Sequence, residues 1–146
     1  WCMIVAIVGS RSFAGLPQIL DYLDVELKSE SDLSIISGGA AGVDAVARDY
    51  AIKRNINFIE LKADWTRYGR AAGPIRNKLI VDMADKVYAF LDERSKGTLH
   101  VIEYAKKLGK PCQILVFSEK NFCVKSALMT QANKIRTKQA LHHKAQ

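Results

Sequence analysis

Residues 33–54, LSIISGGAAGVDAVARDYAIKR, decide the fold. The first five, Leu33–Ser37, form an apolar run of strand length in which apolar and polar residues do not alternate. A glycine-rich turn then leads into a helical pattern over Val43–Arg54. Its apolar positions share one stripe: Val43, Val46, Ala47 and Tyr50. A continuously apolar strand followed by a helix is typical of a parallel sheet that is buried on both faces.

The same unit recurs along the chain. Further apolar runs of strand length are Met3–Val8, Asn57–Leu61, Lys86–Leu91 and Cys112–Phe117. Helical patterns between them cover Leu16–Lys28, Pro74–Ala84 and Thr98–Leu108. This alternation predicts a Rossmann-like, doubly wound α/β fold, with a mostly parallel five-stranded sheet and helices on both faces. The order of the strands in the sheet is not predicted.

Length and charge divide the chain into two parts. Its 146 residues are enough for one globular domain, which we expect to span residues 1–118. That part carries 16 basic and 14 acidic side chains, whereas residues 119–146 carry six basic side chains and one acidic side chain. The second part is predicted to be a basic, partly helical extension with a weak pattern at Val124, Leu128, Ala132 and Ile135. Nucleic-acid affinity, if present, is expected there, because the body is nearly neutral.

Cysteine usage and hydropathy restrict the compartment. Cys2, Cys112 and Cys123 have no metal-ligand spacing, which argues against a disulfide framework or a zinc site and fits a reducing cytoplasm. No metal and no cofactor are expected. No apolar run approaches the ~20 residues that cross a bilayer, and Met3–Val8 is too short for a signal sequence. A membrane partner is therefore not expected.

Four glycine- or hydroxyl-rich sequences fall where strands end or helices begin. In parallel sheets these positions meet at one edge, where ligands bind. Glycines allow an anion to approach the backbone, and helix N-termini, hydroxyls and arginines can bind it. Each loop taken alone could equally be an ordinary strand–helix turn. The predicted ligand-binding residues are Gly9, Ser10, Arg11, Ser37, Gly38, Gly39, Arg76, Asn77, Ser95, Gly97 and Thr98. The P-loop and the GxGxxG dinucleotide fingerprint are both absent.

Two further features have open interpretations. The stretch Ala63–Gly73 is a long predicted connection, either a wall or lid of a binding site or a surface loop anchored by two aromatic rings. Within it, Trp65 and Tyr68 could stack on a base, although core anchoring is as good an explanation for Trp65. His100 is close to the predicted site, but a surface or packing role is the more common one for such a residue.

A set of motifs in the right order connects the chain to a known family. They are GSRSF (9–13), SGGAAGVDAVARDYA (37–51), ADWTRYGRAAGPIRN (63–77), MADKVYAF (83–90) and SKGT (95–98). Together they resemble the YspA/YpsA-related branch of the SLOG superfamily, which bacterial and phage genomes carry. Its relatives include the DNA-processing protein DprA and the LOG-type phosphoribohydrolases. The resemblance implies a Rossmann-like fold that binds nucleotides or nucleotide-derived ligands, and a homo-oligomer.

The comparison with LOG-type enzymes also bears on catalysis. Arg76 looks like the arginine of their catalytic pair, but Val101 stands where their glutamate would be. Asp44, Asp92 and Glu93 remain as substitute carboxylates, so the catalytic candidates are Arg76, Asp44 and Asp92. Asp44 could instead cap its own helix or pair with Arg11.

Three functions therefore remain. The leading one is binding of a nucleotide-derived small molecule, in a sensing, sequestering or processing role. The alternatives are an N-glycosidic hydrolase or transferase acting on a nucleoside monophosphate or an ADP-ribose-like substrate, and a DprA-like nucleic-acid binder.

Overall fold

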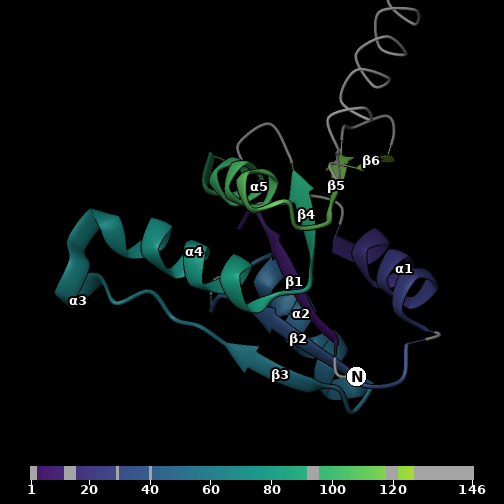
Figure 1. Ribbon diagram of the computed structural model, residues 1–146. Coiled ribbons are helices and arrows are strands. Elements are labelled where there is room, and N and C mark those ends of the chain that lie inside the picture. Colours follow the sequence, from purple (N-terminus) through teal and green to yellow (C-terminus); the bar gives the residue numbers. More distant parts are fainter. Residues whose placement is uncertain are drawn as a thin grey trace, which may run out of the picture.

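A six-stranded sheet forms the centre of the molecule (Figure 1). The computed structural model describes residues 3–11, 16–28, 30–39, 41–91, 96–117 and 122–126. Within them the spatial order of the strands is β3-β2-β1-β4-β5-β6. The strands are β1 (Met3–Gly9), β2 (Leu33–Ser37), β3 (Asn57–Glu60), β4 (Lys86–Leu91), β5 (Cys112–Phe117) and β6 (Phe122–Ser126).

The first five strands are parallel, which confirms the predicted sheet. Strand β1 is central and pairs with β2 on one side and β4 on the other, so that Val5 lies between Ile35 and Lys86. Its side chains alternate between the faces: Val5 and Ile7 belong to one core cluster, and Ala6 and Val8 to the other. Both faces are covered, which explains why the strands have continuous apolar runs.

Strand β6 extends the sheet in the opposite direction. It pairs antiparallel with β5, and Gln113 lies opposite Ser126. The helical expectation is therefore wrong for Phe122–Ser126, which includes Val124. The free edge of β5 offers backbone partners that a helix could not use, and an FCV sequence suits a strand. The other positions of that pattern, Leu128, Ala132 and Ile135, lie outside the described residues.

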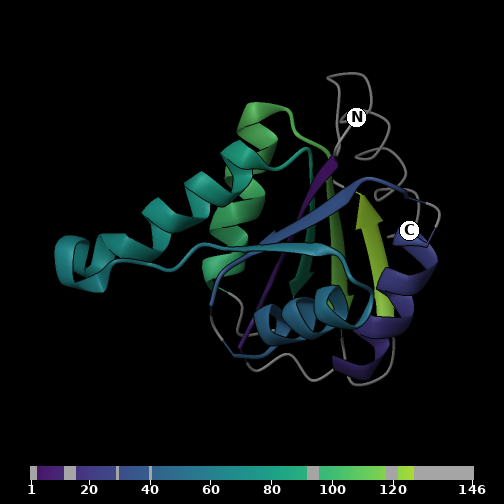
Figure 2. The same cartoon turned by 90° about the horizontal axis from the view of Figure 1, so that it is seen from below.

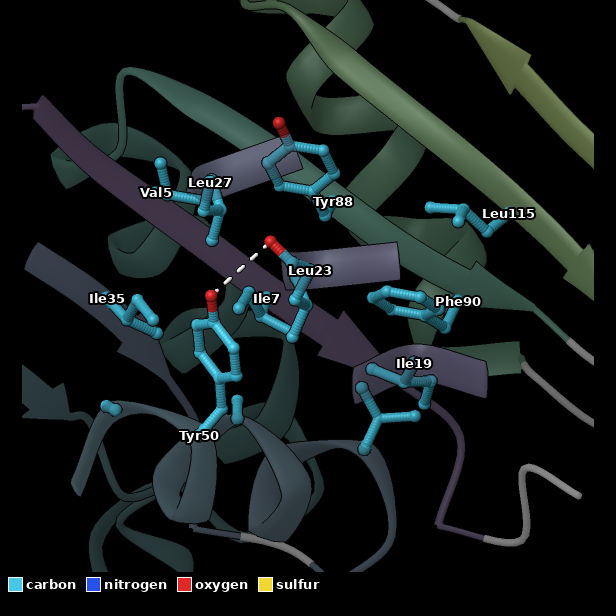
Figure 3. Packing of buried hydrophobic residues seen from close by; sticks show 13 residues of the cluster. Val5, Ile7, Ile19, Leu23, Leu27, Ile35, Tyr50, Tyr88, Phe90 and Leu115 are labelled. Atoms are coloured by element: carbon cyan, nitrogen blue, oxygen red, sulfur yellow. Dashed lines mark hydrogen bonds between the residues drawn. The ribbon is translucent and has the colours of Figure 1, made fainter. Parts of the chain in front are cut away.

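Helices cover both faces, as predicted (Figures 1 and 2). Helices α1 (Leu16–Leu27) and α2 (Val43–Lys53) pack on one face, and α4 (Ala72–Met83) and α5 (Lys96–Leu108) pack on the other. Figure 3 shows the first core, in which the Tyr50 hydroxyl donates to the Leu23 carbonyl oxygen at 3.4 Å. None of the helices in the described part of the chain is long and apolar enough to cross a membrane.

The connection after β3 is more ordered than the sequence predicts. It contains a short helix, α3 (Trp65–Tyr68), and a 3₁₀ turn, η1 (Gly69–Ala71), before α4 begins at Ala72. Helix α3 is capped by Asp64, whose Oδ1 accepts from the Arg67 backbone N–H at 3.1 Å. Because Pro74 occupies the first turn of α4, where it removes no helical hydrogen bond, the helix can start before it. Figure 2 shows that α3 and the start of α4 project away from the sheet. We call residues 65–71 the arm.

Candidate functional site

A pocket of about 450 Å³ lies at the carboxyl edge of the parallel strands. The end of β1 supplies Gly9, Ser10 and Arg11. The first turns of α4 supply Gly73, Pro74, Arg76 and Asn77, and α5 supplies Gly97, Thr98, His100 and Val101. The volume falls within the roughly 300–1,000 Å³ usual for small-molecule sites. The structure therefore brings together most of the residues that the sequence places at the sheet edge.

Two glycines allow the loop after β1 to lie against α2. A β-carbon on Gly9 would lie 2.5 Å from Cγ2 of Val43. Gly42 has a φ of +76°, and a β-carbon there would lie 2.5 Å from the Arg11 carbonyl oxygen. The Val43 N–H donates to the Ser10 carbonyl oxygen at 3.4 Å across the same contact. Glycine is thus required at both positions by packing within the protein, independently of any ligand.

A polar cluster lines the pocket around Gly38. A β-carbon on Gly38 would collide with Nη1 of Arg76 and would lie 2.8 Å from Oδ2 of Asp44. The missing side chain therefore leaves the space in which these two charged groups approach each other. The guanidinium is also held from its other end, because its Nε donates to Oδ1 of Asn77 at 2.9 Å.

Ser37 supports this cluster from below. Its side chain is fully buried, and its hydroxyl donates to the Ile7 carbonyl oxygen at 2.6 Å and lies 2.9 Å from Oδ1 of Asp44. Asp44 itself is 6% exposed and lines the pocket. Ser37 is thus placed to orient Asp44, and it is not among the residues that line the pocket.

Gly39 lies beside β3 and not at the pocket. A β-carbon on Gly39 would face Oε1 of Glu60 at 3.2 Å, beside β3, and Gly39 does not line the pocket. Of the other predicted residues, Ser95 and Asp92 lie outside the described residues, as does the substitute carboxylate Glu93.

Several residues that line the pocket are not among the predicted ligand-binding residues. Trp65 is 54% exposed, and its indole Cη2 would be 3.4 Å from a β-carbon on Gly73, at the rim of the pocket. Ile80 and Val101 form an apolar part of the pocket wall. His100 also borders the pocket, and its Nδ1 is buried without a hydrogen-bond partner. The only sequence signal for His100 was its place two residues after Thr98, in the first turns of α5.

The charges in the pocket suit an anion. Among the described lining residues, Arg11 and Arg76 are permanently cationic and Asp44 is the one acidic side chain. The N-termini of α2, α4 and α5 add partial positive charge at the same edge. The described residues contain no group of three or more His, Cys, Asp or Glu that could hold a metal ion.

This geometry, a doubly wound parallel sheet with a pocket at its carboxyl edge, is that of a Rossmann-like α/β fold. Comparison with known families shows which family the sequence resembles. Residues 3–68 match the model of the YspA, cpYpsA-related SLOG family, which confirms the resemblance carried by the motifs. None of the curated proteins compared with the sequence matches it significantly.

Two solved structures share the fold. DNA processing protein A from Helicobacter pylori, which binds single-stranded DNA, matches with a TM-score of 0.63 and 22% identity, over 82% of this chain and 68% of its own. DNA processing protein A from Streptococcus pneumoniae matches with a TM-score of 0.65 and 21% identity. That match covers 81% of this chain and only 52% of the S. pneumoniae chain. At such identities the likeness concerns the fold.

Proposed function

We propose that the pocket binds a nucleotide-derived ligand whose phosphate group lies against Arg76. The observation that carries this proposal is the approach of the Arg76 guanidinium to Gly38 inside a pocket at helix N-termini. Arginine presents a planar fork of donors that matches phosphate oxygens. Glycine at position 38 leaves room for the guanidinium within the pocket.

The rest of the pocket fits the remainder of a nucleotide. Trp65 presents a half-exposed indole at the rim, packed over Gly73, and an aromatic face suits a nucleobase. Asp44, held by Ser37, adjoins the same space beside Gly38 as the Arg76 guanidinium and is placed to restrain it. We assign to Asp44 this positioning role. The proposed function is thus a nucleotide-binding module, with sensing or sequestration as its use.

Calorimetric titration with AMP tests the phosphate site. Arg76→Met should weaken binding by about 10- to 150-fold, which corresponds to the ~1.5–3 kcal/mol of a hydrogen bond to a charged group. Lys78→Met is the matched control, because Lys78 is on the same helix but exposed, with its Nζ 5.7 Å from the centroid of the Tyr104 ring. Equal affinities in the wild type and Arg76→Met would overturn the proposal.

Single-stranded DNA is a second candidate ligand, and the arm is the observation that favours it. Trp65 and Tyr68 are exposed there, and the Arg67 guanidinium lies 5.1 Å from the centroid of the Tyr68 ring. Arg70 is exposed in the following 3₁₀ turn. Aromatic rings among arginines are the usual elements of single-strand binding. The solved relative from H. pylori binds single-stranded DNA, and this proposal extends that property to the present chain.

Salt dependence separates the two candidates. Binding of an oligothymidylate, followed by fluorescence anisotropy, should weaken steeply with salt if phosphates are contacted. Replacing Arg67 and Arg70 by alanine should reduce the slope of log K against log salt by about 0.7 for each DNA phosphate that the variant no longer neutralises. A chain ending at Ser126 keeps β6 and removes most of the basic extension. If the truncated chain loses DNA binding while the variant with Arg67 and Arg70 replaced keeps it, the extension and not the arm is the DNA site.

We also propose a homo-oligomer that works in a reducing cytoplasm. Helix α4 exposes Leu79 and Met83, which are 50% and 43% exposed and one turn apart, so a second copy could bury them. A 16.3 kDa particle in light scattering at micromolar concentration would contradict the oligomer.

A further inference from the structure

His100 approaches the pocket with only one of its two ring nitrogens available. Its Nδ1 is enclosed by protein atoms and has no hydrogen-bond partner, while the residue as a whole is half-buried and lines the pocket. Of the two ring nitrogens, Nε2 is therefore the one that remains for a hydrogen bond to a ligand. None of the roles assigned above to Arg76, Asp44 or Trp65 uses this group.

The buried Nδ1 also determines which hydrogen the ring offers. A protonated imidazole, or the tautomer with its hydrogen on Nδ1, would bury an N–H group that has no acceptor. The neutral tautomer with its hydrogen on Nε2 leaves only a lone pair at Nδ1. The arrangement of Nδ1 therefore favours the tautomer in which His100 can donate from Nε2 at the α5 side of the pocket.

The α5 side differs in charge from the Arg76 side. Its lining residues Gly97, Thr98, His100 and Val101 carry no permanent charge, whereas Arg76 is a fixed cation. Thr98 is 6% exposed, so a hydroxyl that could both donate and accept lies at this wall. The full charge of Arg76 exceeds the partial positive charge at the N-terminus of α5, so an anionic group is drawn toward Arg76 and the α5 wall is left for a polar group without a full charge.

Resting on the proposed function, we propose that His100 recognises the ribose of the bound nucleotide, with Nε2–H donating to a sugar hydroxyl. A hydroxyl fits this wall better than a carbonyl of a base. It can accept from His100 and at the same time donate to a neighbouring oxygen such as that of Thr98, whereas a carbonyl can only accept. The ligand class is therefore a ribonucleotide, distinguished from its deoxy analogues at the His100 wall.

The test compares AMP with 2′,3′-dideoxyAMP by calorimetric titration of the full chain. The wild type should bind AMP about 5- to 10-fold more tightly, the effect of one hydrogen bond. His100→Leu should lose that preference by weakening AMP binding alone. His100→Gln should recover much of it, because its amide nitrogen can occupy the position of Nε2, whereas His100→Asn places its amide at the enclosed Nδ1 position and should not. Glu103→Gln, one turn further along α5 and exposed, is the control and should behave as the wild type.

The outcomes separate this inference from the proposed function. If Arg76→Met weakens both nucleotides equally and His100→Leu abolishes the AMP preference, both stand. If Arg76→Met weakens both but the preference survives in the folded His100→Leu and His100→Gln proteins, or is absent from the wild type, the ribose assignment is wrong and the phosphate site remains. If the wild type binds neither nucleotide, both are overturned. Thermal unfolding of each variant confirms that the compared proteins are folded.

Discussion

The Arg76 guanidinium and Gly38 are in such close contact that position 38 has no room for a β-carbon. These residues are far apart in the sequence, one after β2 and the other in the first turns of α4. Gly38 is thus the position at which the smallest change would disturb the candidate phosphate site.

Gly38→Ala should displace the Arg76 side chain and weaken AMP binding by about 10-fold or more, the effect of removing a hydrogen bond to a charged group. Gly39→Ala is the matched comparison, because its β-carbon would face Glu60, and it should change affinity by less than about twofold. The sequence predicts both glycines as ligand-binding residues, and in the structure Gly38, not Gly39, lies beside Arg76. Calorimetric titration of the two alanine variants decides between them.

Gly42→Ala should be markedly destabilising. Its φ of +76° is unfavourable for alanine, and the β-carbon would also collide with the Arg11 carbonyl oxygen. Gly109→Ala shares the first defect, with a φ of +70°, but has open space around it. Urea unfolding should give a loss of about 1–2 kcal/mol for Gly109→Ala and about 1–3 kcal/mol more for Gly42→Ala. Equal losses would show that the collision is relieved by a shift of the loop.

Lys110 holds the C-terminal end of α4, and its removal should destabilise the fold. Its Nζ donates to three backbone carbonyl oxygens, those of Val81, Asp82 and Ala84, at 2.7, 2.7 and 2.8 Å. Val81 and Asp82 belong to the last turn of the helix, whose carbonyls have no partner within the helix itself, and Ala84 follows directly after it. Lys110→Met should reduce the free energy of unfolding by about 1.5–3 kcal/mol in urea, whereas the exposed Lys107→Met should change it by less than about 0.5 kcal/mol.

Release of adenine from AMP should be inefficient. Val101 lines the pocket and is 2% exposed, at the position where LOG-type enzymes are expected to have a glutamate. Cleavage of an N-glycosidic bond needs stabilisation of a cationic sugar centre, usually by a carboxylate. Chromatography should therefore detect release far below the ~10 s⁻¹ typical of enzymes. Efficient release that disappears in Asp44→Asn would instead make Asp44 the catalytic carboxylate.

Stability should fall at alkaline pH, in part through Cys112. Burial raises the pKa of its thiol from the ordinary 9.0 to about 11. The folded state therefore keeps a proton that the unfolded chain releases, so the stabilisation is complete below pH 9 and is lost as the pH rises toward 11. Urea unfolding at pH 8 and pH 11 should show a decrease that is smaller, by about 2 kcal/mol, in Cys112→Ala. Burial also raises the pKa of Tyr88 to about 12, which acts in the same direction at still higher pH.

Local pattern was enough to locate the secondary structure of the parallel core. The bounds of β2, β4 and β5 agree with the apolar runs, because each of these strands lies between two covered faces and needs apolar residues throughout. Periodicity failed at Phe122–Ser126 and in the arm. Phe122–Ser126 is a strand because it pairs with the free edge of β5. The arm is helical because Asp64 caps a short helix that precedes Pro74.

The sequence by itself determined the fold class, a resemblance to the YspA, cpYpsA-related SLOG family, and the edge of the sheet where the glycine-rich loops meet. These follow from local hydrophobic pattern and from motif order, which do not depend on how the strands are arranged. Tertiary structure alone decided that Gly38, and not Gly39, contacts Arg76, that Ser37 lies beneath Asp44, and that His100 faces the pocket. The Gly38–Arg76 contact joins elements that are distant in the sequence, and the strand order that places β2 and the start of α4 together has no local signature. The Ser37–Asp44 contact spans only the turn between β2 and α2, but it depends on the exact conformation of that turn, which a hydrophobic pattern does not specify.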